Sequence, residues 1–317
     1  MENTCQKDVV AWFESVRGRS APKFITGLRG TGKTGQLMLL RDRLRDEGVP
    51  EDRILVLDGG APELRRFPAF DDLLRKILSQ LPETGKSYVL VRDASDLPDA
   101  AFLLAALARS ARVEVIATSA ARGLLDEMTD AAPFEVLPPT KPPPYAPAEA
   151  SSRWNEIFLK DVLAQCHVLE VPLIVRVTGW LSDHLGDMLS LRILANAISP
   201  AHRTISPHTA CAYLDALEAA HLVERAPRWD FALDEVIKTG YRYYFTDPEL
   251  RLAHFGPAPQ DERRRMAFNR AWLRLRHTGA KIYSTSGNPE VDFVSQSGGT
   301  RAYWHVDDDD GTLVRLG

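Results

Sequence analysis

Residues 27–34 read Gly-Leu-Arg-Gly-Thr-Gly-Lys-Thr, which matches the pattern G-x-x-x-x-G-K-[ST] of a phosphate-binding loop. Glycines in such a loop let the backbone turn tightly, so that several N–H groups face phosphate oxygens. A short apolar run precedes the loop at 23–26, and Leu37, Leu40 and Leu44 follow it at helical spacing. We therefore expect a strand, the loop, and a helix whose N-terminus is directed at the bound anion.

The loop pattern assigns a role to each of its polar residues. Lys33 is expected to contact the outer phosphates of a nucleotide, and the Thr34 hydroxyl is expected to be a ligand of Mg²⁺. ATP and Mg²⁺ are the predicted cofactors. The residues predicted to bind the nucleotide are Gly27, Arg29, Gly30, Thr31, Gly32, Lys33, Thr34 and Ser119.

The first 137 residues alternate between strand-like and helix-like patterns. Short apolar runs predict strands, and apolar residues at intervals of three and four predict helices between them. The strands are expected at 23–26, 54–58, 88–91, 113–117 and 134–137, and the helices at 33–46, 70–81 and 98–112. Continuous apolar strands that alternate with helices are typical of a parallel sheet covered on both faces. The expected class is therefore α/β.

A P-loop ATPase also needs a pair of acidic residues at the end of a neighbouring strand, one for Mg²⁺ and one for the attacking water. The strand 88–91 is followed by Arg92, Asp93 and Ala94. In one register Arg92 replaces the metal-side Asp and Asp93 replaces the catalytic Glu. In the other register Asp93 is the metal-side Asp and Ala94 replaces the Glu. Either register loses one carboxylate of the pair. Asp93 is therefore the candidate catalytic and metal-binding residue of a weakened site. A third possibility is that another strand supplies the acids.

The strand 113–117 is followed by Thr118 and Ser119. A hydroxyl at this position is a candidate contact for the γ-phosphate, and the alternative is a cap for the next helix. Arg122 is the nearest candidate for an arginine finger, and the region where such a residue is expected is instead rich in proline.

The composition changes after residue 137. The stretch 138–147 reads PPTKPPPYAP, which predicts a polyproline linker, with a PxxP ligand as the alternative. Helical patterns dominate from residue 151. Two helices at 190–198 and 206–221, followed by strand-like pieces at 222–226 and 241–246, predict a winged helix-turn-helix. A further helix is expected at 261–277, and strands at 281–284, 291–295 and 302–306.

Several strings together resemble one family of bacterial and archaeal AAA+ ATPases, whose C-terminal domain of unknown function combines a winged helix with a restriction-endonuclease-like fold. The matching strings are TGLRGTGKT (26–34), VIATSAARGLL (115–125), RWNEIFLKDV (153–162), TACAYLDALEAAHLVERAPRWD (209–230), YRYYFTDPELR (241–251) and EVDFV (290–294). The resemblance implies an AAA+ type P-loop domain at 1–137, a linker at 138–150, a helical region with the winged helix at 151–255, and a truncated α/β nuclease-like domain at 256–317.

The chain departs from this family at positions that matter for chemistry. The family has Asp-Glu where this chain has Arg92-Asp93, and Gly-Ser where it has Ser119-Ala120. Restriction-type nucleases use an Asp followed by an (Asp/Glu)-x-Lys on the next strand. Asp292 is a candidate for the first acid, but the Lys is missing near Trp304, and the acidic run 307–310 is expected to be a solvated turn. Nuclease activity is therefore not expected.

DNA binding is a separate possibility for the second half. The helix 207–221 contains no Lys or Arg, although helices that read bases usually place such residues in their first turns. Phosphate contacts from the helix 261–277 are the alternative, with a merely solvated basic face as the plainer interpretation. The candidate residues on this helix are Arg263, Arg264, Arg270 and Arg274.

The composition limits the remaining classes. The chain has 317 residues with 39 Lys and Arg against 43 Asp and Glu, so its net charge of −4 does not favour general binding to nucleic acids. Three scattered cysteines give no disulfide or metal-binding pattern, and the cytoplasm is the expected compartment. The leading hypothesis is an ATP-binding AAA+ protein with weak or no hydrolysis that acts as a nucleotide-dependent docking or regulatory module. The alternatives are an active ATPase that uses Asp93 and a DNA-binding regulator with a vestigial P-loop.

Overall fold

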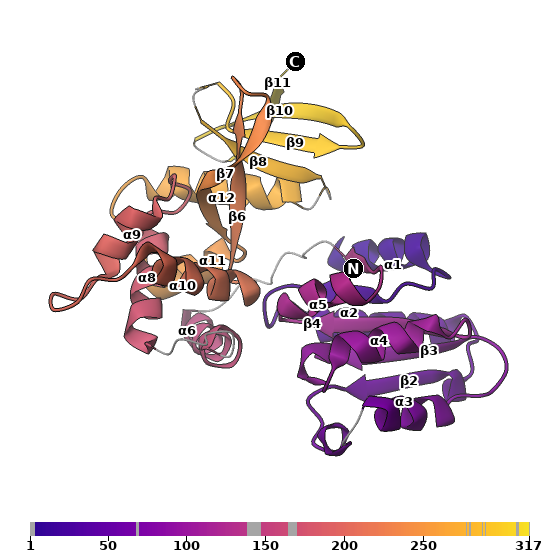
Figure 1. Cartoon of the computed structure of the whole chain (residues 1–317). Coiled ribbons are helices and arrows are strands. Elements are labelled where there is room, and N and C mark those ends of the chain that lie inside the picture. The colour runs from indigo at the N-terminus through magenta and orange to yellow at the C-terminus, as the bar shows by residue number, and fades with distance from the viewer. Residues whose placement is uncertain are drawn as a thin grey trace. The chain divides into compact units, whose positions relative to one another are not determined.

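The computed structural model describes residues 4–67, 70–137, 147–163, 170–276, 278, 280–286, 288, 290–308 and 311–316. The chain divides into two compact units, 1–142 and 143–317 (Figure 1). Residues 138–146 of the predicted linker lie outside the described residues. Residues 147–150, which were also assigned to the linker, instead form the first turn of a helix, because Pro147 occupies its first position, where proline is well tolerated.

A five-stranded parallel sheet forms the centre of the first unit. Its strands are β1 (Lys23–Thr26), β2 (Ile54–Asp58), β3 (Ser87–Arg92), β4 (Val113–Ser119) and β5 (Glu135–Leu137), in the order β2-β3-β4-β1-β5. All five lie within about two residues of the predicted strands, so the α/β parallel sheet is confirmed. After β1 the chain crosses to the far edge of the sheet, and the loop that follows β1 lies where ligands bind in such sheets.

Helices cover both faces of this sheet (Figure 1). They are α1 (Thr4–Val16), α2 (Lys33–Asp46), α3 (Phe70–Ser79), α4 (Ala100–Arg109) and α5 (Gly123–Ala131), with short 3₁₀ turns η1 (Glu51–Arg53), η2 (Leu64–Arg66) and η3 (Ala94–Asp96). Helix α1 is an addition to the predicted elements. Val9, Phe13 and Val16 of this helix are buried, so its amphipathic face completes the layer beside α2.

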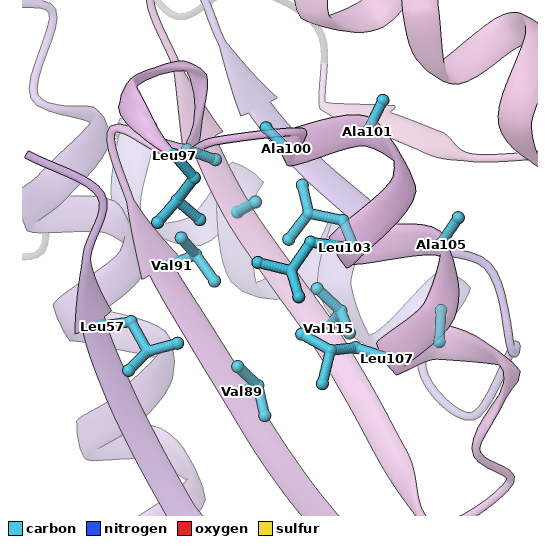
Figure 2. Packing of buried hydrophobic residues seen from close by; sticks show 14 of the residues in the cluster. Leu57, Val89, Val91, Leu97, Ala100, Ala101, Leu103, Ala105, Leu107 and Val115 are labelled. Carbon is cyan, nitrogen blue, oxygen red and sulfur yellow. The ribbon is translucent and has the colours of Figure 1, made fainter. Parts of the chain in front are cut away.

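Each face of the sheet has its own core, and the two cores show which way each strand residue points. Leu90 packs in the cluster that holds Leu37 and Leu40 of α2. Val89 and Val91, the residues on either side of Leu90, pack in the other cluster, which α3 and α4 supply. Figure 2 shows Val89, Val91 and Val115 on the side of the sheet that carries Leu103 and Leu107 of α4, in the same buried cluster. Successive side chains therefore alternate between the α2 face and the α4 face of the sheet, as strand geometry requires.

A buried ion pair lies at the other end of the sheet, where β1 begins. Lys23 is fully buried, and its Nζ lies 3.0 Å from Oε1 of Glu114 on β4. Lys23 also donates hydrogen bonds to the carbonyl oxygens of Arg19 and Ala21, and the Gly18 N–H donates to the Glu114 carboxylate. Burial lowers the pKa of Lys23, and the neighbouring Glu114 opposes that shift.

The second unit combines a group of helices with a six-stranded sheet (Figure 1). Its helices are α6 (Pro147–Ile157), the π-helical turn η4 (Phe158–Val162), α8 (Val171–Asp183), α9 (Leu191–Ile198), α10 (Pro207–Ala219), α11 (Pro248–Phe255) and α12 (Glu262–Arg276). Its strands are β6 (Val223–Asp230), β7 (Glu235–Phe245), β8 (Lys281–Thr285), β9 (Phe293–Ser297), β10 (Thr300–Val306) and β11 (Leu313–Leu316), in the order β11-β10-β9-β8-β6-β7.

This second sheet runs through both parts that the sequence separates at residue 255. Strand β6 pairs with β7 in an antiparallel hairpin and with β8 in a parallel pair, through Arg228 with Ser284 and Trp229 with Thr285. On α11, the buried Arg251 donates hydrogen bonds to the Glu262 carboxylate on α12. The described residues of 143–317 therefore share one sheet and one set of packed helices, and the boundary at 255 stays a prediction. Among the described residues, no helix is both long enough and apolar enough to cross a membrane.

Candidate nucleotide-binding site

The predicted strand, loop and helix are present at the carboxyl end of β1. Gly27, Gly30 and Gly32 have φ angles of 136°, 82° and 87°. Residues with a side chain rarely adopt such angles, so the glycines of the motif are needed for the path of the loop. The Thr31 hydroxyl donates to the carbonyl oxygen of Leu28 at 3.0 Å and braces the turn. Helix α2 then begins at Lys33, directly after Gly32, so the unpaired N–H groups of its first turn lie beside the loop.

Lys33 is buried inside the loop that it follows. Its side chain is only 6% exposed, and its Nζ donates to the carbonyl oxygens of Gly27 at 2.8 Å and Leu28 at 2.9 Å. These two contacts hold a positive charge inside the loop. A phosphate bound in the loop would meet both the ammonium group and the N-terminus of α2. Arg29, Gly30 and Thr34 are partly exposed in the same segment.

The end of β3 places Arg92 on the face of the sheet that α2 covers. Leu90, two residues earlier, packs against α2, and strand alternation gives Arg92 the same side. Val91 lies beside Ala117, so Arg92 is level with Thr118, which in turn pairs with Ile25 of β1. A Mg²⁺ ligand must face the helix that carries Thr34. Of the two registers left open by the sequence, this geometry favours the one in which Arg92 replaces the metal-side Asp.

Asp93 lies just beyond the strand, where the chain leaves the sheet. Its φ angle is 46°, a left-handed conformation that is uncommon for residues other than glycine. Its N–H donates to the Thr118 hydroxyl at 2.9 Å, and its side chain is partly exposed. In the favoured register Asp93 takes the place of the catalytic Glu, with a side chain shorter by one methylene.

Gly59, which follows β2, holds this strand end from the other side. Its N–H donates to the carbonyl oxygen of Arg92 at 2.8 Å, and a Cβ on Gly59 would collide with the carbonyl oxygen of Asp93. We expect Gly59→Ala to destabilise the first unit by about 1–3 kcal/mol, because the backbone at 92–93 must shift. Denaturant unfolding measures the change. The matched control is Gly35→Ala on α2, where a Cβ meets no atom within 4 Å; equal stability of the two variants would contradict this account of Gly59.

Ser119 is used within its own turn. It is fully buried, and its hydroxyl donates to the carbonyl oxygen of Ala121 at 2.9 Å and accepts the Ala121 N–H at 3.0 Å. Of the two roles open to Ser119, this arrangement favours the structural one over contact with the γ-phosphate. Thr118, the neighbouring hydroxyl on the α2 face, is also buried and holds Asp93.

The residues around the loop do not form the donor set that Mg²⁺ needs. Mg²⁺ in a nucleotide site takes oxygen ligands in octahedral geometry, usually with at least one carboxylate. Thr34 offers a hydroxyl, but the metal-side position carries the guanidinium of Arg92, which repels a divalent cation. The predicted Mg²⁺ therefore does not fit these side chains.

The candidate DNA-binding residues of the second unit are largely engaged within that unit. On α12, Arg264 pairs with Asp308 at 2.9 Å, Arg270 pairs with Glu249 at 2.8 Å, and Arg274 donates to the carbonyl oxygen of Gly311 at 2.7 Å. On α10, the exposed Asp215 pairs with Arg225 at 2.6 Å. These contacts favour the plainer interpretation of the α12 arginines, a solvated basic face.

The candidate nuclease acid also has a structural use. Asp292 precedes β9, and its Oδ2 accepts the N–H of Val306 at 2.8 Å and lies 2.9 Å from Nδ1 of His305. The carboxylate therefore braces the end of β10.

No family model matches the chain. It is 21% identical to an uncharacterized protein of Haemophilus influenzae (strain ATCC 51907 / DSM 11121 / KW20 / Rd) over 330 residues, which cover 90% of this chain and 82% of that protein. Similar solved structures include the Aeropyrum pernix ORC1 protein in complex with DNA, with 10% identity, coverage of 80% of this chain and 92% of that chain, and a TM-score of 0.30.

A second solved structure is a DNA polymerase III gamma subunit-related protein from Thermotoga maritima, with 10% identity, coverage of 68% and 98%, and a TM-score of 0.33. A third is domain III of the Thermotoga maritima replication initiation protein DnaA, with 14% identity, coverage of 68% and 92%, and a TM-score of 0.28. No functional conclusion rests on likenesses of this degree. The strand order defines the first unit as an α/β fold, and the segment with the P-loop sequence pattern connects β1 to α2.

Proposed function

We propose that this chain is an AAA+ type protein that binds ATP through residues 27–34 and hydrolyses it slowly or not at all. Its nucleotide state would regulate how the second unit docks on a partner. The observation that carries the proposal is a complete phosphate-binding loop beside a strand end that presents Arg92 to the metal side. The strand order of the sheet and the resemblance of the strings 26–34 and 115–125 support the AAA+ type.

The proposed nucleotide binding rests on the loop. Three glycines with positive φ angles shape it, Lys33 is held inside it, and the N-terminus of α2 adds the favourable end of a helix dipole. Together these features supply the hydrogen-bond donors and the charge that a di- or triphosphate requires. The adenine specificity comes from the family resemblance alone.

The proposed weak hydrolysis rests on the residues at the end of β3. Phosphoryl transfer depends on positioning and on neutralising the charge that develops on the phosphate. With Arg92 at the metal-side position, the carboxylate that would order Mg²⁺ is missing. Asp93 retracts the base by one methylene, and misplacement on the scale of about 1 Å can cost about 100-fold in rate. Both changes oppose turnover.

The docking role is assigned to residues 143–317. Helices α8, α9 and α10 followed by the β6–β7 hairpin, with an isolated bridge between Met188 and Arg242, have the element order of a winged helix. Helix α12 followed by β8, β9 and β10 has the order that opens a restriction-endonuclease-like fold. The arginines of α12 and Asp292 already have partners within the unit. They therefore favour a module without nuclease activity that docks on a protein rather than on DNA.

The test measures ATP binding and phosphate release on one purified sample. We expect saturable ATP binding with a turnover at least about 100-fold below the ordinary enzymatic value of about 10 s⁻¹. Arg92→Asp, which restores a carboxylate on the metal side, is expected to raise the turnover measured with Mg²⁺. Robust turnover by the native chain would contradict the proposal. Loss of that turnover in Asp93→Ala would then favour the alternative of an active ATPase that uses Asp93.

A further inference from the structure

We infer that this site binds its nucleotide without Mg²⁺, and that the guanidinium of Arg92 takes the place of the metal against the phosphate oxygens. The inference rests on the proposed nucleotide binding and adds to it a mode of charge neutralisation. Its starting point is the mismatch between the predicted Mg²⁺ and the side chains at the strand ends.

Arg92 lies two strands away from β1, on the same face of the sheet as the loop helix α2. Arg92, Thr118 and Ile25 form one row across β3, β4 and β1, and all three side chains lie on the α2 face. Neighbouring strands lie about 4.8 Å apart, so the Cα of Arg92 is about 10 Å from β1. The residue between them is Thr118, whose short side chain is fully buried. Only one strand, with the short Thr118 side chain in this row, separates Arg92 from β1, so a long side chain at position 92 can extend toward the loop.

The guanidinium of Arg92 is only weakly held by its neighbour Asp58. Its Nη1 lies 3.6 Å from Oδ2 of Asp58 on the neighbouring strand β2, and the two side chains are 39% and 45% exposed. An ion pair with this exposure contributes only about 0–1 kcal/mol. The Nε of Arg92 is shielded from solvent and has no hydrogen-bond partner among the described residues. Exchanging Asp58 for a phosphate therefore costs little.

A phosphate is a better partner for the guanidinium of Arg92 than the carboxylate of Asp58. A guanidinium presents paired N–H donors that match two oxygens of a phosphate, and charge-assisted bonds of this kind are about twice as strong as neutral ones. With Lys33 in the loop and Arg92 at the strand end, two cations would face a bound phosphate chain. A divalent ion at the same place would meet the repulsion of Arg92.

The test compares the dissociation constant of ATP in excess Mg²⁺ with that in excess EDTA, by equilibrium titration of the full chain. We expect the native protein to bind ATP within about threefold under the two conditions, and Arg92→Gln to lose at least about tenfold in EDTA, as for a lost charge-assisted hydrogen bond. Arg92→Asp should bind at least about tenfold more tightly in Mg²⁺ than in EDTA, because it restores a metal-side carboxylate.

Two controls keep the outcome interpretable. Arg109→Gln, at the end of α4, removes an exposed arginine on the opposite face and should leave both constants unchanged. Thermal unfolding of each variant shows whether it is folded. Native binding that requires Mg²⁺ overturns the inference and leaves the proposed nucleotide binding intact. Native affinity of Arg92→Gln in EDTA overturns it as well. Absence of ATP binding under both conditions overturns the inference and the proposed function together.

Discussion

Replacing Lys33 by alanine is expected to weaken ATP binding by about 100-fold, because each hydrogen bond to a charged group contributes about 1.5–3 kcal/mol. The ammonium group of Lys33 lies inside the loop, where the carbonyl oxygens of Gly27 and Leu28 hold it. Its removal deletes a positive charge inside the loop. Equilibrium titration of the native and variant chains with ATP measures the change.

The matched control for this prediction is Lys76→Ala, which removes an exposed lysine from α3 and should leave the affinity unchanged. Thermal unfolding of Lys33→Ala would show whether the loss of two hydrogen bonds has unfolded the loop region. A Lys33→Ala variant that is folded and binds ATP like the native chain would favour the second alternative, a DNA-binding regulator in which the P-loop is vestigial.

The second large effect concerns stability. Glu114→Gln is expected to destabilise the first unit by about 3–5 kcal/mol, because it leaves the buried Lys23 without its counter-charge. Denaturant unfolding measures the loss. The buried environment already lowers the pKa of Lys23, so the unfolded chain holds the proton of this lysine to higher pH than the folded chain. The destabilisation that Glu114→Gln causes should therefore become smaller as the pH rises toward the ordinary lysine pKa.

An exposed ion pair of similar length serves as the comparison. Arg19 and Glu135 lie 2.6 Å apart, and the Arg19 side chain is 55% exposed. Arg19→Ala should cost no more than about 1 kcal/mol. Replacing both buried partners, as in Lys23→Met with Glu114→Leu, should recover most of the stability that Glu114→Gln loses. Equal effects of Arg19→Ala and Glu114→Gln would contradict the assignment of Lys23 and Glu114 as a buried pair.

The sequence predicted the first unit well because its signals are local. Each strand is a short apolar run, each helix has its apolar residues on one face, and the loop motif fixes the connection between β1 and α2. Helix α1 was missed although Val9, Phe13 and Val16 recur at helical spacing, a signal that a search for periodicity from the first residues would have found.

The arrangement of the second unit could not be predicted in the same way. Strands β6 and β8 pair through Arg228 with Ser284 and Trp229 with Thr285, residues far apart in the chain. Local patterns predict that a segment is a strand but do not identify its partner. The single sheet that links the expected winged helix to the expected nuclease-like part is therefore visible only in the structure.

The candidate site shows the same limit at a finer scale. Arg92 and Asp93 are neighbours, so the motif alone could not say which of them faces the metal side. The packing of Leu90 against α2 supplies the missing information, because it fixes the side on which Arg92 emerges. Ser119 is similar: its sequence context allowed two roles, and its hydrogen bonds with Ala121 favour the turn.

The most direct measurement is the crystal structure of the full chain with ATP, grown in the presence of Mg²⁺. We predict intact ATP in the loop 27–34, with Lys33 and Arg92 both within hydrogen-bond distance of phosphate oxygens and no metal between them. A Mg²⁺ ion coordinated by Thr34 and Asp93, with Arg92 still paired with Asp58, would contradict the central claim that the guanidinium of Arg92 takes the place of the metal at the phosphates.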